Sequence, residues 1–518
     1  MRAMRFIFGS TALVLPLVLA CGSDGSGAAE EEGGETAGEV GSAEGASSDG
    51  EGDTGNPPPS SNAKGLSIAG VTANQGVAIP IASGTSWVGG AERNARLVER
   101  RDTLIRAYFN LDDGWVPRDI ECRLRLEFGD GTSTELVNVM STVSASSQQN
   151  QLNSTCNFYL DDEAGHTAAG TKFQVGFYET SEGAGAGLSE HPNLAPAEAA
   201  QDVGFEAGDM VMKVKLVPVL YQNQTAPLEA NLDLLRDQMF QQNPLNRIDI
   251  SVREPVPSSS ADLYQLLNLM EQTKAQDGAP NNEYYFAFVN TGQQWGTIGL
   301  APLGGTVAAG LWLQSPQMNT ETFVHEVGHD QNMGHVECPD FGMPPFETYP
   351  YPNGFVGVTG FGIINNQLYP AFENYNYMTY CGQGGGQWAS DWNWGAVWGR
   401  IQQFTAQGDA MPRQPVLRGM VGGSADGELV ENWWTTRGEV DSELLSGNEL
   451  FTFRQGEDFE VQVLGEVRTL SDSTSLWITV ALPEGFDPAR GHITRTSLGQ
   501  EHALELRSDA LYHTLTTQ

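Results

Sequence analysis

The segment HEVGHDQNMGH, residues 325–335, decides the fold of this chain more than any other stretch. On an α-helix, side chains four residues apart share a face, so His325 and His329 can direct imidazole nitrogens at one metal ion. Glu326 follows His325 at about 100° round the helix axis, where its carboxylate reaches a water held by the metal rather than the metal itself. The spacing predicts a helix with two metal ligands and a general base.

His335 is a third candidate ligand, but it cannot lie on the same helix. Six further residues at about 1.5 Å each would place it roughly 9 Å beyond His329. The helix must end between them, and Asn332 and Gly334 readily adopt the left-handed backbone conformation. Three neutral imidazoles leave one position of a tetrahedral Zn²⁺ open for water, which predicts a catalytic zinc site. The alternative, a buried helix with incidental histidines, is disfavoured because the chain has only eight His in all.

Residues 325–335 resemble the extended zinc motif of the metzincin clan of zinc endopeptidases, although Asn332 stands where the clan usually has glycine. Downstream, NYMTYC at residues 376–381 resembles the methionine-containing turn that lies beneath the metal in this clan. The resemblance implies that Met378 forms the floor of the site. Tyr380 matches a position that in some metzincin families offers a tyrosine hydroxyl to the metal or to the tetrahedral intermediate. Each of these two residues, taken alone, would be an ordinary core residue.

A finer resemblance, over roughly residues 325–400, is to bacterial secreted metzincins related to the StcE-like mucin-cleaving proteases. It is carried by Cys338, YPYP at residues 349–352, MTYC at 378–381 and WASDW at 388–392. The resemblance implies a zinc endopeptidase that hydrolyses peptide bonds of extracellular proteins or glycoproteins, bound as extended chains. It does not specify the substrate.

Five cysteines favour an exported, oxidised protein. Cys122 with Cys156, and Cys338 with Cys381, fall in two separate regions, as two local disulfides would. The second bridge would tie the segment after the third histidine to the methionine turn. The alternative is that these are reduced core thiols. Cys21 is left over.

Residues 1–20 have the pattern of a signal peptide, with arginines before a short apolar run. VLAC at residues 18–21 resembles a bacterial lipobox, which implies a lipidated Cys21 and an anchor at the outer membrane or cell surface; plain secretion is the alternative. Residues 21–62 contain no aromatic residue and no Lys or Arg, which predicts a disordered acidic tether. The net charge of −38 argues against nucleic acid as a partner, and we expect a monomer.

The sequence predicts a multidomain α+β protein in which a metzincin-like zinc protease domain is flanked by two β domains. Short alternating strands over residues 63–207 predict a β-sandwich. Residues 208–410 mix strands and helices and would form the catalytic domain. Residues 411–518 return to strands and would form a small C-terminal β domain. Two finer predictions concern the cleft: Val307–Gln314 would be the edge strand above it, and Asn319 or Thr320 would cap the zinc helix.

Two other classes of function remain open. The chain could be a surface adhesin or glycan-binding lipoprotein whose protease domain is catalytically silent, although the intact histidines and glutamate argue against it. It could also be a structural envelope protein in which zinc only stabilises the fold. A fourth protein ligand in place of water would favour that reading.

Overall fold

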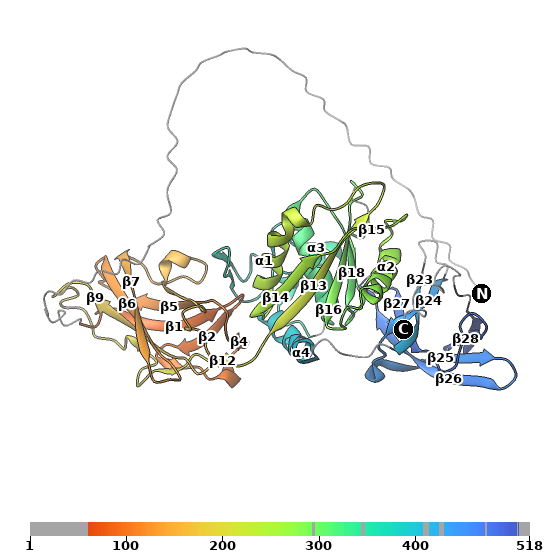
Figure 1. Cartoon of the computed structure of the whole chain (residues 1–518). Helices are drawn as coiled ribbons and strands as arrows, with labels where there is room; N and C mark the ends of the chain where they lie inside the picture. Colours follow the sequence, from red (N-terminus) through yellow and green to blue (C-terminus); the bar gives the residue numbers. More distant parts are fainter. Residues whose placement is uncertain are drawn as a thin grey trace, which may run out of the picture. The chain divides into compact units, whose positions relative to one another are not determined.

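The computed structural model describes residues 61–292, 296–342, 348–407, 414–423, 429–471, 474–504 and 506. The expected signal peptide, the lipidated Cys21 and nearly all of the tether therefore lie outside the described residues. Among the residues described, no helix has the length and apolar character needed to cross a membrane. The structure is multidomain and rich in sheet (Figure 1). The domain boundaries near residues 207 and 410 stay predictions.

Two antiparallel sheets form the part that follows residue 61. One has the order β3-β2-β1-β5-β8 and the other β10-β9-β6-β7, with β11 also pairing with β9. Their strands are β1 (Leu66–Asn74), β2 (Ala78–Ser83), β3 (Ser86–Trp87), β5 (Thr103–Leu111), β6 (Arg118–Glu127), β7 (Ser133–Val143), β8 (Cys156–Leu160), β9 (Lys172–Glu179), β10 (Leu194–Ala195) and β11 (Gln201–Asp202). A short parallel pair, β4 (Leu97–Val98) with β12 (Phe205–Glu206), accompanies them.

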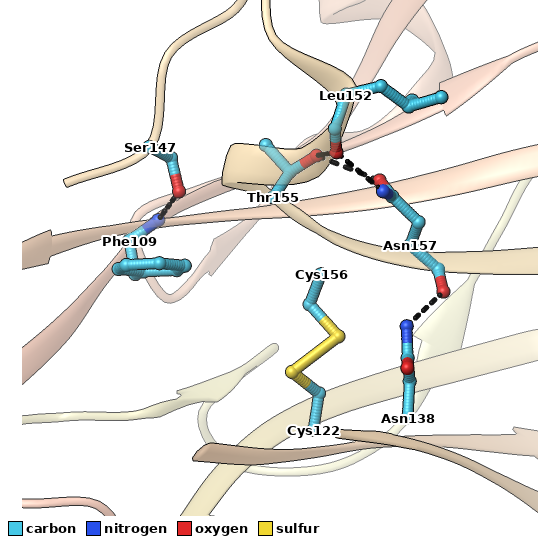
Figure 2. The surroundings of a disulfide bond; sticks show 8 residues. All are labelled: Phe109, Cys122, Asn138, Ser147, Leu152, Thr155, Cys156 and Asn157. Carbon is cyan, nitrogen blue, oxygen red and sulfur yellow. Dashed lines mark hydrogen bonds between the residues drawn. A yellow bond between two sulfur atoms is a disulfide. The ribbon is translucent and has the colours of Figure 1, made fainter. Parts of the chain in front are cut away.

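The two sheets share one apolar core. Phe109 on β5 meets Phe177 on β9 edge to face, with ring centroids 5.6 Å apart. Cys122 on β6 and Cys156 on β8 are both fully buried and form a disulfide, so a covalent bond joins the sheets (Figure 2). Alternating inward side chains explain this packing, since each strand presents every second residue to the other sheet.

A mixed sheet of order β14-β13-β16-β18-β17 forms the middle of the chain, with β15 also pairing with β13. Its strands are β13 (Val211–Leu220), β14 (Arg247–Val252), β15 (Val256–Pro257), β16 (Glu283–Val289), β17 (Gly299–Leu300) and β18 (Val307–Leu311). All pair in parallel except β17, which runs antiparallel to β18. Strands buried on both faces account for the nearly continuous apolar run of β16.

Helices cover both faces of this sheet (Figure 1). Tyr284, Phe286 and Phe288 of β16 share a core with residues of α1 (Leu232–Gln242), α3 (Pro316–Asp330) and α4 (Asp391–Gln407). The alternate residues of β16 share the opposite core with α2 (Leu263–Gln276). Residues 325–330 of the sequence motif thus lie on α3, a helix packed against the sheet.

One sequence prediction about this sheet is wrong. The expected edge strand Val307–Gln314 ends at Leu311 and lies inside the sheet, between β16 and β17. All five of its residues are buried, as suits an inner strand. Antiparallel β17 is the edge.

The predicted cap of the zinc helix is also wrong. Ser315 is the N-cap, its hydroxyl accepts a hydrogen bond from the Met318 amide, and Pro316 occupies the first turn. A proline in the first turn costs the helix no hydrogen bond, which explains the earlier start. Asn319 lies inside the helix. Its side-chain oxygen accepts a hydrogen bond from the Leu313 amide, and its side-chain nitrogen donates one to the Leu313 carbonyl. Thr320 also lies inside the helix, and its hydroxyl donates to the Gln317 carbonyl.

After α3 the chain forms two small pairs, and after α4 a second large sheet. The pairs are β19 (Gly360–Gly362) with β20 (Gln367–Tyr369) and β21 (Tyr375–Asn376) with β22 (Gln387–Trp388). The antiparallel sheet has the order β24-β23-β27-β26-β25-β28-β29. Its strands are β23 (Gln414–Gly423), β24 (Leu429–Gly438), β25 (Leu445–Gln455), β26 (Phe459–Thr469), β27 (Leu476–Ala481), β28 (His492–Ser497) and β29 (Gln500–Ala503). Trp434 and Trp477 of this sheet share the core that covers α2.

Candidate metal centre

The zinc-motif segment forms the end of α3 and the turn that follows it. His325, Glu326 and His329 lie on the helix, which ends at Asp330. Asn332 then adopts φ +71°, the left-handed conformation for which the clan usually has glycine, and so reverses the chain. The Met333 amide donates to the Gly328 carbonyl at 3.1 Å and closes the turn. The reversal returns His335 to the face that carries the other two imidazoles.

The three imidazoles converge. The Nε2 atom of His329 lies 3.0 Å from that of His325 and 3.1 Å from that of His335. The potential ligand atoms all lie within 4.8 Å of one another. The structure therefore brings together the three histidines that the sequence singled out.

Hydrogen bonds fix which ring nitrogen of two histidines carries the proton. His325 Nδ1 lies 2.7 Å from the Tyr377 carbonyl, and His329 Nδ1 lies 2.7 Å from the Met333 carbonyl. A carbonyl can only accept, so both Nδ1 atoms are protonated and both Nε2 atoms present lone pairs to the common point. Converging lone pairs repel unless a cation lies between them. Backbone carbonyls orient metal-binding histidines in this way, so the donor set fits a divalent ion such as Zn²⁺.

The electrostatic surroundings favour neutral imidazoles. Burial lowers the pKa of His325 to about 4. Burial and then the neighbouring His325 lower the pKa of His335 to about 3. The pKa of His329 is held well below its usual range, again chiefly by burial. Neutral imidazole is the form that binds metal, so these rings need not lose a proton at neutral pH.

The Glu326 carboxylate is confined by two residues that the sequence analysis did not single out. A Cβ atom added at Gly299 of β17 would lie 2.3 Å from Glu326 Oε1, so only glycine leaves room there. On the other side, the Ser471 hydroxyl lies 3.3 Å from Oε2. Burial raises the pKa of Glu326 to about 8, and the Ser471 hydrogen bond opposes that rise.

Met378 packs against α3, and Tyr380 lies beside two of the histidines. Met378 is fully buried, and a Cβ atom added at Gly328 would lie 2.5 Å from its sulfur. The Tyr380 ring centroid is 4.7 Å from that of His335 and 5.9 Å from that of His325. The turn that carries Met378 therefore packs against α3 between His325 and His329. The Tyr380 phenol ring of the same turn lies beside the imidazoles.

The second disulfide joins the segment after His335 to the methionine turn. Cys338 and Cys381 form it, and both are buried. The Val336 amide donates to the Met378 carbonyl at 2.9 Å, so hydrogen bonding supports the same connection. Both cysteine pairs expected from the sequence thus lie at bonding distance.

A pocket of about 460 Å³ opens beside His325. Gly299 of the edge strand β17 and the preceding Ile298 line the pocket, as do Tyr380, His325 and Glu326. Glu321, one helical turn before His325, closes part of the pocket and accepts hydrogen bonds from the amides of Gly384 and Gly385 at 2.6 and 2.8 Å. The edge strand, the Glu326 carboxylate and the pocket thus lie next to one another.

Comparison with known proteins gives no relative. No family model matches the chain, and no curated protein matches it. A Bacteroides fragilis structure described as a β-galactosidase aligns over 85% of this chain and 72% of its own, with 8% identity and a TM-score of 0.15. A Parabacteroides merdae β-glucuronidase aligns over 86% and 78%, with 8% identity and a TM-score of 0.16. Neither similarity carries an argument about fold or function.

Proposed function

We propose that this chain is a zinc-dependent endopeptidase of the metzincin type. The observation that carries the proposal is the convergence of three imidazole Nε2 atoms beside the Glu326 carboxylate. The positive φ of Asn332, the position of Met378 under the helix and the antiparallel edge strand β17 are consistent with the same reading.

His325, His329 and His335 would hold the zinc ion. When bound, zinc polarises a carbonyl and lowers the pKa of water to about 7. Three protein ligands, with no fourth carboxylate or thiolate in the cluster among the described residues, are typical of catalytic rather than structural zinc sites.

The chain's own residues would carry the remaining steps. Glu326 would accept a proton from the attacking water and deliver one to the leaving amine, as a buried general base and acid does. Tyr380 would direct its hydroxyl to the oxygen on which negative charge develops. Because β17 ends the described sheet, its backbone would pair with an extended peptide by strand addition.

We further propose extracellular proteins or glycoproteins as substrates, reached from a lipid anchor at Cys21 on the outer membrane or cell surface. The two disulfides are consistent with an oxidising compartment.

The test is to incubate the purified protein with a mixed peptide library, with and without a chelator, and to read cut sites by mass spectrometry. We expect chelator-sensitive cleavage. Glu326→Ala should keep zinc but lower turnover by about 10²–10⁴-fold, the usual contribution of a general base. Glu373→Ala removes an exposed carboxylate of the same region and should change nothing. Zinc-loaded protein that cuts nothing would instead favour the silent adhesin.

A further inference from the structure

The sheet formed by β23 to β29, here called the C-terminal sheet, contacts the Glu326 carboxylate through a residue that follows β26. Where β26 ends, the Thr469 carbonyl accepts from the Leu303 amide at 2.9 Å, and the Ser471 amide donates to the Ala301 carbonyl at 2.8 Å. Residues 469–471 therefore pair antiparallel with residues 301–303, which directly follow β17. This pairing begins directly after the part of β17 that borders the pocket.

The Ser471 hydroxyl has a defined direction. Its Oγ atom accepts a hydrogen bond from the Ala301 amide at 3.1 Å and lies 3.3 Å from Glu326 Oε2. A hydroxyl has one proton to donate, and the Ala301 amide already occupies an acceptor site. The proton is therefore left for Glu326. Ser471 is only 5% exposed, so water competes little for this bond.

The segment that carries Ser471 is anchored on both sides. Leu470 is fully buried in the same core as Leu300, and its amide donates to the Ser475 carbonyl at 2.9 Å. Arg468 donates to the Gly304 carbonyl at 2.8 Å, and the Gly304 amide donates to the His329 carbonyl at 2.8 Å. The C-terminal sheet is thus connected to the base and, through one loop, to the end of the zinc helix.

We propose that Ser471 is a positioning residue for the Glu326 carboxylate, so that the C-terminal sheet completes the catalytic site. The inference rests on the proposed endopeptidase function. With Gly299 against one oxygen and the Ser471 hydroxyl on the other, the carboxylate is held in one orientation toward the pocket. A base held in this way needs no reorganisation when it accepts a proton.

The experiment compares Ser471→Ala and Ser471→Thr with wild type in peptide hydrolysis by the full chain. Losing a hydrogen bond to a charged group changes an equilibrium constant about 10- to 100-fold. Ser471→Ala loses such a bond to Glu326, so its kcat should fall by that factor. KM and zinc content should stay within twofold of wild type, by rough estimate, since neither substrate nor metal contacts are removed. Ser471→Thr keeps the hydroxyl and should restore most of kcat.

Ser497→Ala is the matched control. The Ser497 hydroxyl donates to Glu449 Oε1 at 2.7 Å, so this variant also loses a serine-to-glutamate bond within the C-terminal sheet, in a cluster with Arg495. It should keep wild-type kcat. All variants are assayed below their melting temperatures, so that unfolding is not read as lost catalysis.

The outcomes separate this inference from the proposed function. Wild type and Glu326→Ala are measured together, and equal background rates in both would overturn the endopeptidase proposal itself. If those two differ but Ser471→Ala turns over like wild type, only the positioning role is overturned. A fall in kcat for Ser497→Ala as large as for Ser471→Ala would also overturn it, because the effect would then be general to the sheet.

Discussion

The two disulfides lie in two different kinds of interior. Cys122–Cys156 joins two sheets across a core in which apolar side chains such as Phe109 and Phe177 fill the space. Cys338–Cys381 lies beside an interior that contains three imidazoles and the Glu326 carboxylate. Burying polar groups destabilises a fold unless they find partners. The first interior buries apolar side chains, whereas the second buries polar groups that need partners.

Arg106 shows how a buried polar side chain of the two-sheet part can find its partners within the protein. Arg106 is fully buried, and its guanidinium donates to the Thr155 hydroxyl and to the carbonyls of Gln149 and Gln151. His329 is equally buried, yet its Nε2 faces only other imidazole nitrogens. The first pattern satisfies the buried group within the protein, whereas the second would be completed by the proposed metal ion.

The largest expected effect is that of His329→Ala, which removes one of the three proposed zinc ligands. Loss of an outer-shell partner usually lowers metal affinity about 10- to 100-fold, and loss of a ligand should exceed that. Zinc after dialysis, measured by elemental analysis, should fall far below one per chain, and hydrolysis should fall with it. Arg106→Lys is the counterpart in the two-sheet part. It should lower the melting temperature and leave bound zinc unchanged; zinc loss there would break the comparison.

Gly299→Ala should have the next largest effect. The added methyl group would lie 2.3 Å from Glu326 Oε1 and 2.7 Å from Cδ, so the carboxylate must move. A displacement of about 1 Å at a reacting group can lower the rate about 10²-fold, and kcat/KM should fall by that order with zinc retained. Gly129→Ala is the control, because a Cβ atom there meets nothing within 4 Å. An active Gly299→Ala enzyme would contradict the placement of the base.

Removing each disulfide should distinguish the two interiors most directly. The bridges close segments with sequence separations of 34 and 43 residues, for which chain entropy predicts a similar loss of about 4 kcal/mol each. We therefore expect similar shifts in denaturant unfolding for the double alanine variants at Cys122 with Cys156 and at Cys338 with Cys381. Only the second pair should lower kcat/KM of the folded protein, since it connects His335 to the methionine turn. Equal losses of activity would show that the two interiors are coupled.

Features encoded in short sequence separations could be predicted. His325 and His329 share a face because of the helical repeat. The chain must reverse before His335 because the rise per helical residue would otherwise carry it away from the other two. Both cysteine pairs lie within 43 residues of sequence. In each case one local rule restricts the geometry strongly.

Features that depend on distant pairing could not be predicted. Ser471 lies 145 residues from Glu326, and no local pattern indicates that their side chains meet. β17 has two residues, too few for an alternating pattern, so the sequence favours the longer run Val307–Gln314 as the edge. Ser315 was missed as a cap because the polar residues after Pro316 offered competing caps.

The smallest expected effect concerns Asn332, which adopts φ +71° at the position where the metzincin motif usually has glycine. Asn332→Gly should keep zinc and activity and change stability by less than about 1 kcal/mol, because glycine tolerates positive φ. Asn332→Ala should cost about 1–2 kcal/mol, the penalty for the left-handed conformation. Thr142 adopts φ +51° in the two-sheet part, so Thr142→Gly should instead stabilise the protein in the same denaturant assay. If Asn332→Gly lost zinc, the asparagine side chain and not the turn alone would position His335.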